Sequence, residues 1–90
     1  MKIEWDPKKA LSNRRKHKVS FEEAATALED PMAATGPDPD QSLAESRYVT
    51  FAVSSAGRLL VIAHTDDGEI SRIISARLAS RGERRIYEEG

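Results

Sequence analysis

The chain is predicted to fold as one small α+β domain over residues 1–90, with its elements in the order β-α-α-β-β-β-α. Three observations predict this class. Ninety residues are too few for two separate hydrophobic cores. Two helix-start signals lie in the first third, and three β-rich runs joined by short turns follow in the second half. We therefore expect an antiparallel sheet with the helices packed on one face.

The first third of the chain is expected to contain a strand and two helices. Apolar and charged side chains alternate over residues 2–5, which is typical of a short strand. Asp6 followed by proline predicts a helix over about residues 7–16. Ser20, with a glutamate three positions later, forms a capping box that predicts a second helix over about residues 21–29.

The second half predicts a three-stranded meander and a final helix. Over residues 47–54 the side chains Val49, Phe51 and Val53 alternate with Tyr48, Thr50 and Ala52, which is typical of a strand. Residues 59–63 form the continuous apolar run of a central strand. Asp-Gly at residues 67–68 predicts a hairpin turn before a third run rich in isoleucine. A second capping box predicts a helix over about residues 81–88. Residues 30–45 hold three prolines and four acids without periodicity, so a loop is expected there.

Charge is segregated along the chain although the net charge is −1. Residues 1–20 carry seven basic and two acidic groups, and residues 21–46 carry seven acidic and no basic groups. Residues 47–90 carry seven basic and six acidic groups, with five arginines and one glutamate within residues 72–85. Basic patches of this kind attract phosphates. No run is long enough to span a membrane and no signal peptide is visible, so we expect a cytoplasmic protein without a membrane partner.

The available functional groups favour phosphoryl chemistry. The chain has no cysteine and only two histidines, 47 positions apart, which argues against thiol chemistry and a His/Cys metal site. Arginine binds phosphate bidentately and remains charged, so Arg72 and Arg77 are candidate catalytic charge stabilisers. His64 is a candidate proton carrier, although the sequence somewhat favours a structural histidine at this position.

The arginines form one site only under a geometric condition. In a regular strand, five positions place Arg72 and Arg77 on opposite faces, so the strand must bend or end between them. Three further arginines fall on neighbouring turns of the final helix and offer one basic surface: Arg81, Arg84 and Arg85. Surface arginines also serve solubility and ion pairing, which is the competing interpretation of each one.

The sequence resembles the BrnT family of ribonuclease toxins over nearly its whole length. The segments that carry this resemblance are Trp5-Asp6, Lys16-His17, Val19-Ser20-Phe21, Asp30-Pro31, Gly57-Arg58-Leu59-Leu60, Arg72-Ile73-Ile74-Ser75-Ala76-Arg77, Glu83-Arg84 and Tyr87. The resemblance implies a RelE-like fold and RNA cleavage that needs no metal or other cofactor and arrests translation. In such a protein we expect Arg81, Arg84 and Arg85 to hold RNA phosphates, and Tyr87 either to stack on a base or to pack. It also implies a BrnA-like ribbon-helix-helix antitoxin, through which the complex would bind operator DNA.

Two alternatives remain open from the sequence. The chain is also compatible with a non-catalytic adaptor whose acidic loop docks a basic protein. The second alternative is a weakened toxin that acts mainly as an operon co-repressor. It stays open because Asp66-Asp67 stands where many relatives carry a basic residue, so a positive charge beside the phosphate is missing. Growth on induction and the neighbouring reading frame would separate these alternatives.

Overall fold

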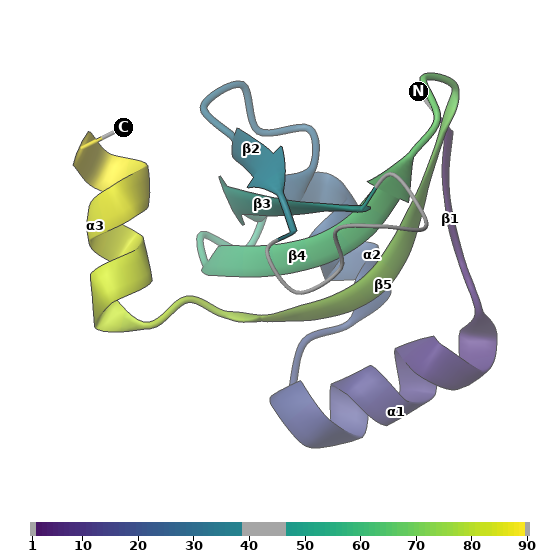
Figure 1. The fold of residues 1–90 in the computed structure, drawn as a ribbon. Coiled ribbons are helices and arrows are strands. Elements are labelled where there is room, and N and C mark those ends of the chain that lie inside the picture. Colours follow the sequence, from purple (N-terminus) through teal and green to yellow (C-terminus); the bar gives the residue numbers. More distant parts are fainter. Residues whose placement is uncertain (1, 39–46, 90) are drawn as a thin grey trace.

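The computed structural model describes residues 2–38 and 47–89, and confirms the α+β class and, apart from one additional strand, the expected order of elements. Figure 1 shows the sheet with its helices. The elements are β1 (Lys2–Trp5), α1 (Pro7–His17), α2 (Phe21–Ala27), β2 (Ala34–Pro37), β3 (Arg47–Val53), β4 (Leu59–Asp66), β5 (Ile70–Leu78) and α3 (Arg81–Glu89).

The sheet differs from the expected meander at both edges. Its strand order is β1-β5-β4-β3-β2, and β1 runs parallel to β5 while the other pairs are antiparallel. The expected loop contains strand β2, which pairs with β3 from Ala34 to Pro37. Proline is tolerated on an edge strand because its missing N–H is not needed there. Both differences depend on long-range pairing, which local sequence patterns do not report. The rest of the acidic segment, residues 39–46, lies outside the described residues.

The predicted caps form at the expected positions. Asp6 accepts a hydrogen bond from the Lys8 N–H at 2.8 Å at the start of α1. Ser20 Oγ accepts from the Glu23 N–H at 3.0 Å at the start of α2. The capping box of α3 is complete, because Ser80 and Glu83 each accept from the other's backbone N–H. These local bonds satisfy N–H groups that a helix start otherwise leaves unpaired.

The hydrophobic core lies between one face of the sheet and the helices α1 and α2. Its fully buried side chains are Val19, Phe21, Ala24, Ala27, Ala52, Leu60, Ile62, Ile73 and Ala76. Trp5 packs edge-on against Phe21, with ring centroids 6.1 Å apart. On β3 the residues on this side are Thr50 and Ala52, both buried. The more apolar row of β3, which includes Val49 and Phe51, therefore points to the opposite side of the sheet.

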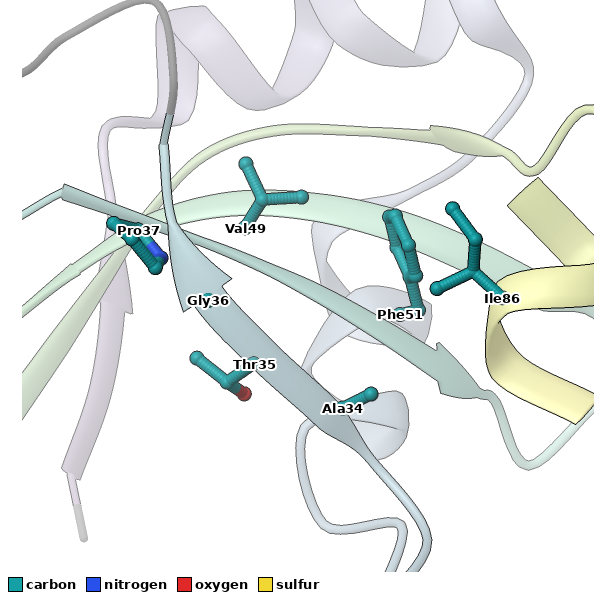
Figure 2. Close-up of a pocket in the computed structure, with 7 residues that line it drawn as sticks. All are labelled: Ala34, Thr35, Gly36, Pro37, Val49, Phe51 and Ile86. Atoms are coloured by element: carbon teal, nitrogen blue, oxygen red, sulfur yellow. The ribbon is translucent and has the colours of Figure 1, made fainter. Parts of the chain in front are cut away.

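We call that opposite side the open face. Helix α3 lies on this side, since Ile86 and Phe51 line the same hollow there (Figure 2). The expectation that all helices pack on one face is therefore wrong for α3. The physical reason is that β5 carries the chain past the edge of the core before α3 begins, and Phe51 offers an apolar contact on the open side. Ile86 remains 54% exposed, so this contact is partial.

Candidate functional site

A β-bulge in β5 brings Arg72 and Arg77 onto the same face of the sheet. Arg72 pairs with Thr65 and Arg77 pairs with Val61, whereas the register shifts by one residue at Ala63/His64. Thr65 and Val61 are four positions apart on β4, so both point to the open face. A regular strand would place Arg72 and Arg77 on opposite faces. The extra residue of the bulge in β5 brings both onto the same face. The two arginines lie roughly 13 Å apart along the sheet, at about 3.3 Å per residue of β4.

Arg77 is held in place by the helix that follows it. Its Nη1 and Nη2 atoms donate to Glu83 Oε1 and Oε2 at 2.7 and 2.8 Å, a bidentate ion pair. This pair, together with the bonds from Ser80, lowers the pKa of Glu83 to about 2. Glu83 is therefore ionised at neutral pH and is a weak proton acceptor. It positions Arg77 and caps α3 at the same time.

Arg72 lies at the other end of the bulged segment and is more exposed. Its Nη2 donates to Glu4 Oε1 at 3.2 Å, and 57% of its side chain is exposed. An exposed ion pair of this kind is weak and easily exchanged for a phosphate contact. In the same cross-strand row, Arg47 of β3 pairs with Thr65, which places a further arginine on the open face.

The final helix extends the basic surface away from the sheet. Arg81, Arg84 and Arg85 are all exposed on α3, which stands at the end of β5 (Figure 1). Within residues 2–38 and 47–89, no ion pair involves any of these three arginines. Their charges therefore face solvent, as a surface that binds backbone phosphates requires.

Tyr87 anchors this helix to the rest of the molecule. Its hydroxyl donates to Asp30 Oδ2 at 2.7 Å, and the same carboxylate oxygen accepts from the Val53 N–H at 2.9 Å. These bonds lower the pKa of Asp30, and the carboxylate raises the pKa of Tyr87. The hydroxyl of Tyr87 thus ties α3 to Asp30, and stacking of its ring on a base stays a prediction.

The structure does not bring His64 together with the arginines. His64 is 4% exposed and lies on the core side of β4, opposite to Arg72 and Arg77. Its Nδ1 lies 3.2 Å from the Thr65 carbonyl, and its Nε2 lies 2.7 Å from Thr50 Oγ1. Burial lowers the pKa of His64, so the neutral ring is favoured. With Nδ1 as the donor to a carbonyl, Nε2 accepts from Thr50, whose oxygen in turn accepts from Thr35.

An apolar hollow of about 310 Å³ lies on the open face between β2, β3 and α3. Figure 2 shows Phe51, Val49 and Ile86 pointing into it, with Gly36 and Pro37 of the edge strand beside them. Phe51 pairs with Val61, which pairs with Arg77, so the aromatic ring and the guanidinium belong to one cross-strand row. Two strand spacings separate them, about 10 Å. The sequence analysis missed this hollow because it depends on register and on where α3 packs.

The described residues offer little for metal binding. Across residues 2–38 and 47–89, no group of three or more histidine, aspartate or glutamate side chains is arranged to hold a metal ion. The helices described here are too short and too polar to cross a bilayer. Arg47, Glu4 and Phe51 contribute to the open face and were not assigned a role from the sequence. The capping-box spacing marked Glu83, but only the fold shows its contact with Arg77.

The fold and the open face define a small α+β domain with an arginine-rich surface suited to phosphate. A family model for the BrnT ribonuclease toxin of type II toxin–antitoxin systems matches residues 5–83, and the chain therefore belongs to that family. The crystal structure of the Brucella abortus ribonuclease toxin BrnT superposes with a TM-score of 0.70 at 25% identity, covering 90% of this chain and 99% of that chain. A search of curated protein sequences finds no match.

Proposed function

We propose that this protein is an endoribonuclease toxin that cleaves RNA on its open face without a metal ion and thereby inhibits translation. The observation that carries the proposal is the bulge that directs Arg72 and Arg77 to one exposed face. Membership of a ribonuclease toxin family supports the reaction class. The fixed donors of this surface are guanidinium groups, which bind phosphate oxygens and do not ligate metal ions.

The proposed step is an internal transesterification. The 2′-hydroxyl of the RNA gives its proton to water and its oxygen bonds to the adjacent phosphorus, while the bond from phosphorus to the 5′-oxygen breaks. The leaving 5′-oxygen takes up a proton, so the products are a 2′,3′-cyclic phosphate and a 5′-hydroxyl. Negative charge accumulates on the phosphate oxygens in the transition state. Arg77, already oriented by Glu83, stabilises that charge without a reorganisation cost, and Arg72 supports it.

Substrate binding would use the whole open face. The exposed arginines of α3, Arg81, Arg84 and Arg85, hold backbone phosphates. The apolar hollow at Phe51 accepts a base next to the phosphate, because unstacked RNA bases pack on aromatic side chains. We assign His64 to the support of β3 and β4, since its ring is buried and bonded on the core side.

The expected partner is a BrnA-like antitoxin with a ribbon-helix-helix part. Membership of a toxin–antitoxin family implies an antitoxin. We propose that an acidic segment of the antitoxin covers the arginines of the open face and of α3, and that the complex reaches operator DNA through the antitoxin. Such a contact silences the protein by occupying the surface that RNA would use.

The test of this function is cleavage of a defined RNA by the purified protein. We expect cleavage to continue in EDTA, to leave a 2′,3′-cyclic phosphate, and to stop when the 2′-hydroxyl at the scissile nucleotide is replaced by hydrogen. Cleavage that is lost in EDTA and restored by magnesium would refute the mechanism. An absence of both cleavage and growth inhibition would favour the adaptor or co-repressor alternative.

A further inference from the structure

A second basic hollow lies outside the surface used by the proposed reaction. It occupies about 190 Å³ between α1 and β5 and is lined mainly by polar and cationic residues, among them Lys9, Lys16, His17, Ser12 and Ser75. Of the seven basic residues among the first twenty, Lys9 and Lys16 line this hollow. Another hollow on α1 is lined by Arg14, Arg15, Lys18 and Leu11. The apolar hollow at Phe51 has the opposite character.

We call this hollow the basic groove. Its two walls, α1 and β5, are joined by buried hydrogen bonds. Among the described strands, β1 pairs with β5 only as far as Ile73. Beyond that point the side chain of Asn13 in α1 hydrogen-bonds to the backbone of β5. Its Oδ1 accepts from the Ala76 N–H at 3.1 Å, and its Nδ2 donates to the Ala76 carbonyl at 2.8 Å. Nδ2 also donates to the Val19 carbonyl at 2.9 Å, and Asn13 is 7% exposed. The buried amide therefore fixes the distance between α1 and β5.

The groove is strongly cationic. Helix α1 contains no acidic residue, and Lys9 and Lys16 are both exposed. Seven positions separate them, which places them on the same side of the helix and about 10 Å apart along its axis. Over residues 2–38 and 47–89, no ion pair involves Lys9, Lys16 or His17. Two uncompensated ammonium groups in a hollow attract an anion with more than one charge.

The groove borders β5, the strand that carries Arg72 and Arg77. Ser75 lines the groove and also lies on β5 between Arg72 and Arg77. It pairs with Ala63, two positions from the partners of both arginines on β4, so all three β5 side chains share one face. A strand of nucleic acid that leaves the open face over the β5 edge therefore meets Lys9 and Lys16 next.

We propose that this groove binds backbone phosphates of the RNA strand flanking the bond cut on the open face. The inference rests on the proposed function and adds a second phosphate-binding region to it. RNA is favoured over a protein partner because ammonium, imidazole and hydroxyl donors predominate in the groove, whereas the centre of a protein interface is enriched in aromatic and apolar side chains.

The test compares two double variants with the same helical spacing. Lys9→Gln with Lys16→Gln removes two charges from the groove. Lys8→Gln with Arg15→Gln removes two exposed charges, also seven positions apart on α1, from outside it. Binding of an uncleavable 2′-deoxy dodecanucleotide is measured over a range of salt concentrations, together with binding of a trinucleotide. Thermal melting checks that both variants fold.

The groove variant is expected to bind the long oligonucleotide roughly tenfold more weakly, and to lower the slope of log affinity against log salt by about 1.4, the value for two lost single-strand phosphate contacts. The control variant and the trinucleotide should change by less than about twofold. Equal effects of both variants, or no effect of the groove variant, would overturn the proposal. So would unchanged oligonucleotide binding with weakened antitoxin binding. These experiments measure binding without cleavage, so their outcome is independent of whether the ribonuclease function is correct. The ribonuclease function is tested separately by cleavage with the Arg77→Ala variant.

Discussion

Replacement of Arg77 by alanine should abolish most RNA cleavage while leaving the protein folded. Arg77 is the arginine of the open face that the structure orients most firmly, through two hydrogen bonds to Glu83. Removal of one fixed donor that stabilises transition-state charge typically costs about 10²- to 10³-fold in rate, or roughly 3–4 kcal/mol. We expect Arg77→Ala to lose cleavage on this scale.

The effect on stability should be much smaller. The Arg77 and Glu83 side chains are 43% and 23% exposed, and partly exposed ion pairs contribute at most about 1 kcal/mol. A loss of about 1 kcal/mol changes the unfolding equilibrium roughly fivefold. Partial unfolding therefore cannot imitate a hundredfold loss of cleavage in a domain that remains mainly folded. Circular dichroism and thermal melting measure this directly.

The chain contains a matched control for this experiment. Arg58 also forms a bidentate ion pair with a glutamate three positions after a helix cap, in this case Glu23 of α2, with side-chain exposures of 36% and 15%. Arg58 lies just before β4, and its partner Glu23 belongs to α2, which packs on the core side of the sheet and not on the open face. Arg58→Ala should destabilise the protein by a similar amount and keep cleavage. Wild-type cleavage by folded Arg77→Ala, or an equal loss in both variants, would refute the reasoning.

Three further predictions concern stability and partner binding. The pKa of Glu83 is lowered from 4.5 to about 2, so its contribution to the free energy of unfolding is complete above about pH 4.5 and is lost as the pH falls through about 2. Glu83→Gln can still cap α3 but cannot titrate. Unfolding measured over a range of pH should therefore show less acid sensitivity in this variant. Asn13→Ala should lower the free energy of unfolding by about 1–3 kcal/mol in urea titrations, because it leaves the backbone N–H and carbonyl of Ala76 buried and unpaired. An unchanged urea midpoint would contradict the role of Asn13 as their hydrogen-bond partner. Association with the antitoxin should slow as salt rises, and hydrogen exchange should show protection on β5 and α3; protection confined to residues 30–38 would contradict occlusion of the arginines.

Local chemistry in the sequence determined the class of fold and the positions of most elements. Asp6, Ser20 and Ser80 mark three helix starts, and hydrophobic periodicity marks the meander. These signals are readable because caps and periodicity act within a few residues. The arginines that we propose bind phosphate were readable for the same reason, since they are close neighbours in the sequence.

Only the tertiary structure decided which of these residues act together. The bulge in β5 arises from its register with β4 and places Arg72 and Arg77 on one face. Register likewise buries His64 on the core side and places Phe51 on the open face. Alternation along β3 alone does not say which of its two faces the helices cover. Strand β2 forms only because β3 supplies its partner. The physical reason is common to all four: strand pairing and packing join residues far apart in the chain, and a shift of one residue moves a side chain to the opposite face.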